Sequence, residues 1–94
     1  MKIITFANSF KRAYKTLNRK HPELQPKVEA VLTLLAENSF DSSLQTHKLK
    51  GELAGSWACT VEYDCRIVFD FVENPESGDQ EILLLDIGSH DEVY

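Results

Sequence analysis

The sequence predicts a single α+β domain in which two helices cover one face of a mainly antiparallel sheet. Apolar residues recur at helical spacing in two segments of the first half, and alternate with a period of two in the second half. A short β-branched stretch comes before the first helix, so the predicted order is β-α-α-β-β-β. Helices and strands segregated in this way are typical of α+β domains. Ninety-four residues suffice for one modest core, so we expect one domain over residues 1–94.

Residues 2–6 are β-branched and aromatic and predict a short first strand. The following helix is predicted to begin at Asn8 or Ser9, because their short polar side chains suit an N-cap. It is predicted to end near Lys20, since the residue before Pro22 is disfavoured in helical dihedrals. Its apolar residues fall on one helical face: Phe6, Phe10, Ala13, Tyr14 and Leu17.

A second amphipathic helix is predicted from about Pro22 to Glu37, with both prolines near its start, where a missing N–H costs least. Its apolar stripe consists of Leu24, Val28, Val31, Leu32 and Leu35. Two matching stripes and a tight connection predict an antiparallel helical hairpin. The polar stretch 38–46 then predicts an irregular loop whose Phe40 and Leu44 tuck under the domain.

The segments around Trp57–Tyr63 and Arg66–Val72 alternate in polarity and predict an antiparallel hairpin. Residues 74–79 form the clearest turn signal in the chain. The mostly apolar segment 81–87 then predicts a strand inside the sheet rather than at its rim.

The net charge of −5 hides a strong polarity along the chain. Residues 1–50 hold nine Lys or Arg and four Asp or Glu, a net +5, whereas residues 51–94 hold one and eleven, a net −10. This distribution is compatible with a basic surface on an acidic protein, and equally with solvated helix faces beside an acidic tail. The chain has no signal-peptide pattern and no apolar run of about 20 residues, and it has two cysteines. We therefore expect a cytoplasmic protein with reduced thiols and no membrane association.

The residues capable of catalysis or of binding a phosphate occur in three parts of the sequence. His47, Lys48 and Lys50 lie just before the sheet, Arg66 is the only cation after Lys50, and His90 follows the last strand. A histidine near neutral pKa can exchange a proton with the 2′-oxygen or the leaving 5′-oxygen of RNA. Lysine and arginine can neutralise charge on the scissile phosphate. The alternatives are that the histidines are surface polar groups and that Arg66 pairs with an acidic neighbour on its hairpin.

No pattern in the sequence indicates a metal or a cofactor. The three histidines share no i, i+4 spacing, and the cysteines at positions 59 and 65 do not have zinc-site spacing. Both thiols lie in apolar, strand-like surroundings, which are typical of buried and inert packing residues. A glycine-rich phosphate loop is also missing from the sequence.

The order and spacing of several short motifs resemble the RelE/YafQ-like toxins of bacterial type II toxin–antitoxin systems. The resemblance covers nearly the whole chain and includes the predicted β-α-α-β-β-β order. The segments that carry it are His47-x-Leu49-x-Gly51-x-x-x-Gly55, Val61-Glu62-x-Asp64, Arg66-Ile67-Val68-Phe69 and Ile87-Gly88-x-His90. The predicted fold is therefore RelE-like.

The resemblance implies a ribosome-dependent endoribonuclease that cuts translated mRNA and is inhibited by a cognate antitoxin protein. His47 and His90 would match the catalytic histidines, and Asp64 the acidic residue of the YafQ-like branch. Arg66 would match the phosphate-binding arginine of related toxins. Lys48 and Lys50 would match basic residues that bind substrate near the same loop. No metal is expected, because the 2′-hydroxyl of the RNA is itself the nucleophile.

Two positions depart from this pattern and keep a second function open. Thr60 stands where YafQ-like enzymes have another histidine, and Trp57 where many relatives have an arginine. With the net acidity, these residues are compatible with a non-catalytic or ParE-like binding module that blocks a protein target such as gyrase. A housekeeping domain without an antitoxin is the third interpretation.

Overall fold

The computed structural model describes residues 1–89, so the predicted site residue His90 lies outside the described residues. Three short 3₁₀ segments (Pro22–Leu24, Ser42–Leu44 and Gly51–Leu53) connect the main elements. The helices and strands are β1 (Ile3–Phe6), α1 (Asn8–Lys20), α2 (Gln25–Glu37), β2 (His47–Lys48), β3 (Trp57–Glu62), β4 (Cys65–Glu73) and β5 (Gln80–Gly88).

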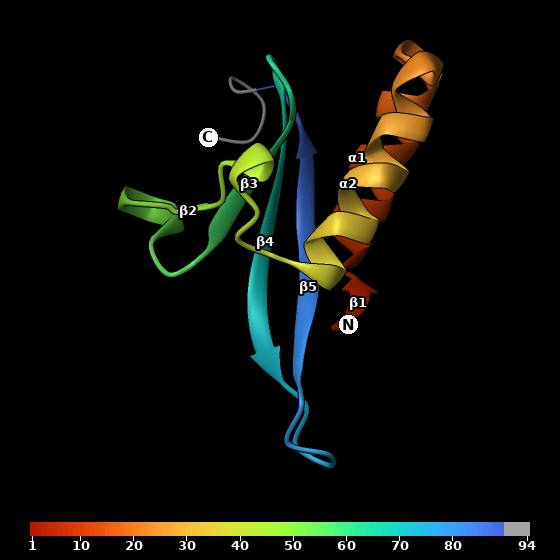
Figure 1. Ribbon diagram of the computed structural model, residues 1–94. Helices are drawn as coiled ribbons and strands as arrows, with labels where there is room; N and C mark the ends of the chain where they lie inside the picture. Colours follow the sequence, from red (N-terminus) through yellow and green to blue (C-terminus); the bar gives the residue numbers. More distant parts are fainter. Residues whose placement is uncertain (90–94) are drawn as a thin grey trace.

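The five strands form one sheet in the order β1-β5-β4-β3-β2. Every neighbouring pair is antiparallel except β1 and β5, which are parallel. Both helices lie side by side on one face of this sheet (Figure 1). The predicted α+β fold is therefore confirmed. The structure adds the two-residue strand β2, and it places β5 inside the sheet as predicted.

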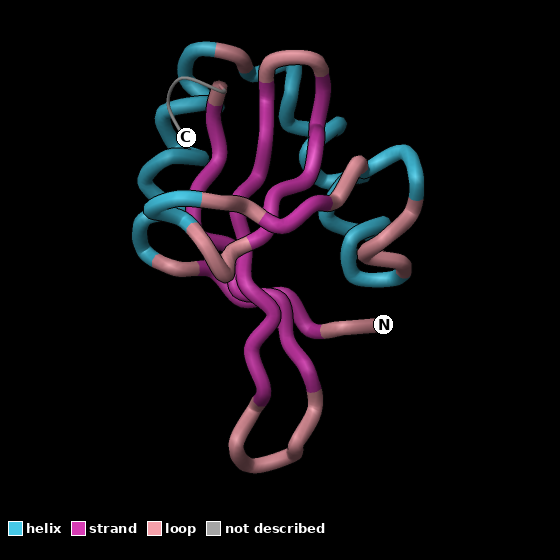
Figure 2. Tube along the Cα trace, turned by 90° about the vertical axis from the view of Figure 1, so that its left-hand side faces the viewer, coloured by secondary structure: helices cyan, strands magenta, loops and turns pink. Residues whose placement is uncertain are grey.

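The β4–β5 hairpin is the longest feature of the sheet and extends well beyond the helices (Figure 2). Asn74 organises its tip, because its Oδ1 accepts a hydrogen bond from the Glu76 backbone N–H at 2.9 Å. The Asn74 N–H also donates to the Asp79 carbonyl at 2.8 Å. The predicted turn at 74–79 is therefore present, and its exposed acids Glu76 and Asp79 lie at the far end of the molecule.

The hydrophobic core lies between the helices and the sheet. Phe10 of α1 and Leu35 of α2 are fully buried against Ile67, Phe69 and Ile82 of the central strands. These residues come from the predicted helical stripes and from one set of alternating strand positions. Among residues 1–89, no helix is both long and apolar enough to cross a membrane.

Three local predictions are corrected by the structure. Ala7 occupies the N-cap of α1, and neither Asn8 nor Ser9 caps the helix. The Ser9 hydroxyl instead donates to the Leu85 carbonyl at 2.6 Å, tying the first turn to β5. The second helix is divided, because the 3₁₀ turn at Pro22–Leu24 precedes α2. Leu44 is buried as predicted, but Phe40 is 59% exposed.

Both cysteines are free and buried in the core cluster. Burial raises the pKa of the Cys59 thiol to about 12, with a smaller contribution from the nearby Cys65. Thiolates are the reactive form, so a thiol held neutral in this way is a packing residue. The prediction of inert cysteines agrees with this environment.

Replacing the fully buried Phe69 with alanine is expected to lower the free energy of unfolding by about 3–5 kcal/mol, because it empties the centre of the core. Urea denaturation followed by circular dichroism measures the change. The matched control is Tyr63→Ala in the β3–β4 turn, where the ring is 94% exposed and the expected change is within about 0.5 kcal/mol. Equal losses in both variants would contradict this description of the core.

Alkylation tests the buried thiols directly. Iodoacetamide at pH 8 is expected to leave Cys59 unmodified in the folded protein, because burial holds its pKa at about 12. The same reagent in 6 M guanidinium is the control, and there it should modify both cysteines. Rapid modification of Cys59 under native conditions, detected by mass spectrometry, would show that the thiol is accessible.

Candidate functional site

The face of the sheet opposite the helices carries two of the candidate residues, His47 and Arg66. His47 of β2 pairs with Ala58 of β3, which in turn pairs with Val68 of β4. Side chains of directly paired residues lie on the same face of a sheet. Ala58 and Val68 are buried but lie outside the main core cluster, so they belong to the face opposite the helices. His47 therefore projects on that face.

The next row of paired residues brings Arg66 onto the same face. Thr60 of β3 pairs with Arg66 of β4, which pairs with Gly88 of β5. Arg66 is half-buried and lies on the central strand. Two strand spacings, about 10 Å, separate the backbones of β2 and β4. The row of Arg66 is also displaced from the row of His47 by two residues, about 7 Å, along the strands.

The backbone carbonyl of Gln45 orients His47. The Nδ1 atom of His47 lies 2.9 Å from this carbonyl oxygen. A carbonyl only accepts hydrogen bonds, so Nδ1 must carry the proton in this contact. In the neutral imidazole the other nitrogen, Nε2, is then the basic atom. Gln45 reaches this position by adopting a left-handed backbone conformation (φ 51°).

Gln45 also contacts Thr60, in the row of paired residues that contains Arg66. The Thr60 hydroxyl donates to Gln45 Oε1 at 3.4 Å, so one glutamine contacts both His47 and Thr60. Gln45 was missed by the sequence analysis. It lies in a polar loop with no periodicity, and only the fold brings its carbonyl against the histidine.

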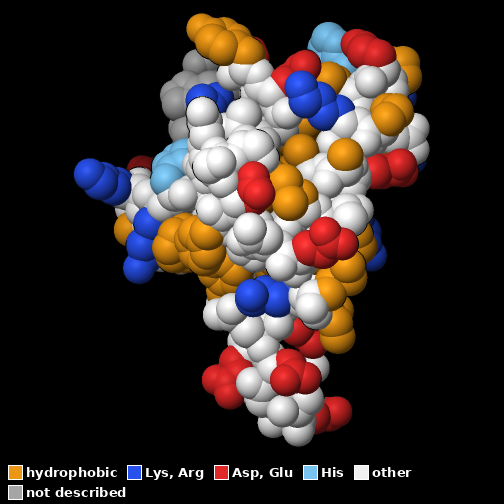
Figure 3. Space-filling view, viewed as in Figure 1, with side chains coloured by type: hydrophobic (Ala, Val, Ile, Leu, Met, Phe, Trp, Pro, Cys, Tyr) orange, Lys and Arg blue, Asp and Glu red, His pale blue; other side chains and the backbone are white. Residues whose placement is uncertain are grey.

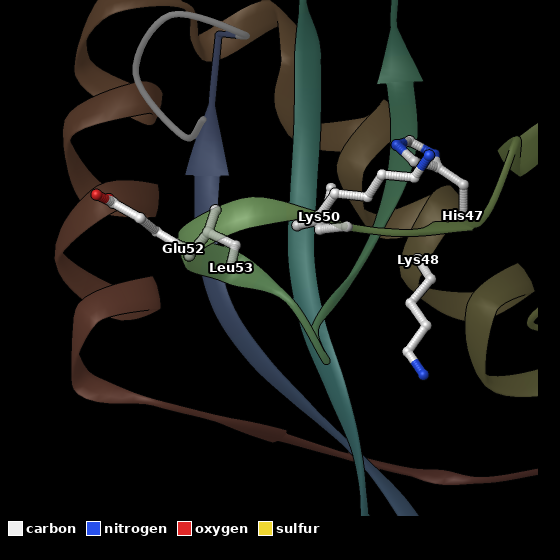
Figure 4. A pocket seen from close by; sticks show the side chains of 6 residues that line it. His47, Lys48, Lys50, Glu52 and Leu53 are labelled. Carbon is white, nitrogen blue, oxygen red and sulfur yellow. The ribbon is translucent and has the colours of Figure 1, made fainter.

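A cavity of about 470 Å³ lies beside His47, between β2 and the 3₁₀ turn at Gly51–Leu53. Its other lining residues are Lys48, Leu49, Lys50, Glu52 and Leu53, so two cations, one acid and two apolar side chains surround it. In Figure 4 the Lys50 side chain runs toward the His47 ring. Positive φ angles at Gly51 and Gly55 (75° and 97°) allow the sharp turns that bound this loop.

Lys48 also lines the cavity, but its side chain points away from the His47 ring in Figure 4. It pairs with Trp57 across the β2–β3 ladder, and its ammonium lies 5.9 Å from the centroid of the Trp57 ring. Successive residues of a strand point to opposite faces, so His47 and Lys48 diverge although they are adjacent in the sequence. The two lysines predicted to share a role both line the cavity, but Lys50 extends toward His47 and Lys48 toward Trp57.

Asp64 lies in a different recess, at the end of the sheet where β3 turns into β4. This cleft of about 410 Å³ includes residues from both helices and from β5, and its polar lining residues are His21, Glu23, Lys27, Glu62, Asp64 and Ser89. Four residues of β3, about 13 Å, separate the row of His47 from Glu62, and Asp64 lies beyond it. Asp64 is therefore close to Ser89, the residue before His90, and distant from His47.

One of the two acidic partners considered for Arg66, Glu62, lies near a different cation. The Glu62 carboxylate lies 3.9 Å from the Lys27 ammonium, and both groups are exposed. Such a pair contributes about 0–1 kcal/mol. Among residues 1–89, no three His, Cys, Asp or Glu side chains gather in a way that holds a metal ion.

The sequence profile described as "Bacterial toxin of type II toxin-antitoxin system, YafQ" matches residues 2–94. The chain belongs to this family of toxins. The resemblance to RelE/YafQ-like toxins, predicted from the motifs, is therefore confirmed. No curated protein sequence gives a significant match.

Solved structures of related toxins share the fold of this YafQ-family chain. YafQ from E. coli strain BL21(DE3) superposes with a TM-score of 0.80 at 18% identity, covering 100% of this chain and 99% of that chain. A YoeB/ParE toxin from Agrobacterium tumefaciens gives 0.75 at 19% identity, covering 96% and 99%. A copper-bound mutant toxin from Helicobacter pylori gives 0.74 at 28% identity, covering 100% of both chains. At 18–19% identity, the first two comparisons establish the shared fold alone.

The neutral form of His47 is expected to carry its proton on Nδ1, because the Gln45 carbonyl accepts from that atom. Nitrogen-15 NMR of histidine-labelled protein distinguishes the two tautomers of the neutral ring. An Nε2-protonated His47 would contradict the hydrogen bond and leave the wrong nitrogen basic.

Proposed function

We propose that this YafQ-family toxin is a ribosome-dependent endoribonuclease that cleaves translated mRNA. The observation that carries the proposal is the oriented His47, which presents a basic Nε2 on the same sheet face as Arg66. Ribosomes and translated messages occur in the cytoplasm, so this is where we place its action.

In the proposed reaction, Nε2 of His47 removes the proton from the 2′-hydroxyl of the substrate. The 2′-oxygen then attacks the adjacent phosphorus, and the bond to the leaving 5′-oxygen breaks. The products are a 2′,3′-cyclic phosphate and a 5′-hydroxyl. The nucleophile belongs to the RNA, so the step needs no metal-activated water.

Arg66 and Lys50 supply the positive charge for the phosphate. Arg66 suits the non-bridging oxygens, because a guanidinium donates two parallel hydrogen bonds. Lys50 lies beside His47 at the cavity and neutralises charge that develops during attack (Figure 4). Lys48, predicted to share this role, points to the other face of β2 and is not assigned to the scissile phosphate.

The remaining predicted roles belong to His90 and Asp64. We assign His90 as the general acid that protonates the leaving 5′-oxygen. Asp64 supports this assignment through its position, because it lines the same cleft as Ser89. Because Asp64 is distant from His47, we assign it to orient His90.

A cognate antitoxin is the second proposed partner. The E. coli relative is known in a DinJ–YafQ complex, at 19% identity to this chain. Here the outer side of α1 is exposed and strongly basic, through Lys11, Arg12, Lys15, Arg19 and Lys20. An antitoxin segment rich in acids that folds on binding would complement this helix and cover the open sheet face.

His47→Ala is expected to slow cleavage of a translated mRNA about 100-fold or more, because the general base is lost. Purified ribosomes translating a defined message provide the assay. Glu76→Ala is the matched control, since Glu76 is exposed at the tip of the β4–β5 hairpin, far from the candidate site. Cleavage by His47→Ala at the wild-type rate would remove the proposed base.

Arg66→Ala is expected to reduce cleavage by a similar factor of about 100, because the phosphate loses its guanidinium partner. Arg66→Lys should recover only part of the rate, since lysine lacks the planar pair of donors. The control is Arg12→Ala on the exposed face of α1. Intact mRNA together with arrested DNA supercoiling in the wild-type assay would instead favour the ParE-like alternative.

A further inference from the structure

The opposite side of β2 carries an aromatic cluster that the proposed reaction does not use. It consists of Phe40, Trp57 and Phe71, and we call it the aromatic platform. The Phe40 ring lies 5.4 Å from Trp57 and 5.8 Å from Phe71, measured between centroids. Trp57 and Phe71 lie 5.6 Å apart. All three rings therefore form one connected group.

Phe40 exposes the platform to solvent, although the other two rings pack against the hydrophobic core. Trp57 and Phe71 pack partly against the buried cluster, whereas Phe40 is 59% exposed. Helix α2 ends at Glu37, so Phe40 covers the two rings beyond the reach of the helix. Hydrophobic side chains gather beside Lys and Arg side chains over the β2 side of the molecule in Figure 3. The exposed ring is thus held in a defined orientation.

A cation accompanies these rings. The Lys48 ammonium lies 5.9 Å from the centroid of the Trp57 ring, within the range of a cation–π contact. The nearest acid in the sequence, Asp41, is turned toward Ser43, whose N–H and hydroxyl both donate to its Oδ1. The Phe40 ring is nearly perpendicular to Trp57 (80°) and tilted by 27° from Phe71, so the platform offers one exposed apolar ring with a positive charge nearby.

We propose that the aromatic platform binds single-stranded RNA by stacking an unpaired base on the exposed Phe40 ring, beside Trp57, with Lys48 at the adjacent phosphate. A nucleotide carries a flat base and an anionic group within one residue, which matches this arrangement. Stacking on exposed aromatic residues next to a basic group is how sequence-tolerant single-strand binding is built.

The position of β2 gives the platform a relation to the cleavage site. β2 is the edge strand of the sheet, with His47 on one face and Lys48 on the other. A single strand of RNA that passes around this edge contacts both faces. Binding at the platform is nevertheless independent of the proposed reaction, because it uses none of the residues assigned to cleavage.

Trp57 is the only tryptophan in the chain, so its fluorescence reports on the platform alone. The probe is a 12-nucleotide 2′-O-methyl oligoadenylate, which cannot be cleaved because its 2′-oxygen is blocked. Saturable quenching of Trp57 is expected, together with increased anisotropy of the labelled oligonucleotide. The same sequence in a perfect duplex should bind more weakly, since its bases are already stacked.

Phe40→Ala is expected to weaken binding of the probe about 5- to 100-fold, the loss typical of one stacked base. Phe6→Ala is the matched control, because Phe6 is 47% exposed at the other edge of the sheet. Lys48→Gln should flatten the dependence of log affinity on log salt by about 0.7. Cleavage assays run separately, so a failure here is distinguishable from failure of the proposed reaction.

Three results would overturn the proposal. The first is no quenching of Trp57 by the probe, and the second is equal affinity of Phe40→Ala and Phe6→Ala. The third is that a second copy of the protein occupies the platform. Sedimentation would then show a dimer that Phe40→Ala abolishes, while binding of the probe would be unchanged in this variant.

Discussion

The pairing of β2 with β3 is the constraint on which the candidate sites depend. It joins only two residue pairs, His47 with Ala58 and Lys48 with Trp57. Because side chains alternate along a strand, this register sends the histidine to the open face and the lysine to the aromatic platform. A shift by one residue would exchange them and leave neither surface intact.

The helices make one face of the sheet available for function. Phe10 and Leu35 pack on the helix-covered face of the sheet and bury it in the core. The exposed polar side chains of β3 and β4 therefore lie on the other face. Charge is segregated on a larger scale as well. The exposed acids Glu76 and Asp79 lie at the tip of the β4–β5 hairpin, far from β2. A chain with net charge −5 thereby keeps cations beside His47.

Much of the architecture was predictable because local patterns and the fold agree. The apolar stripes of both helices and the alternation around Cys59 and Ile67 marked the buried faces correctly. The errors arose where a tertiary contact overrode a local preference. Ser9 suits an N-cap, yet its hydroxyl bonds the Leu85 carbonyl. Phe40 suits burial, yet it lies on top of Trp57 and Phe71 because α2 has already ended.

From the sequence alone, the fold class and the toxin family were predictable, and His47 and Arg66 were recognisable as residues capable of RNA chemistry. These follow from periodicity, motif order and side-chain type, which are local properties. The three-dimensional arrangement was needed to show which of these residues lie near one another. It orients His47 through the Gln45 carbonyl, turns Lys48 toward Trp57 and Lys50 toward His47, and places Asp64 in the same cleft as Ser89. Strand register and loop conformation set those relations, and both depend on contacts between residues far apart in the chain.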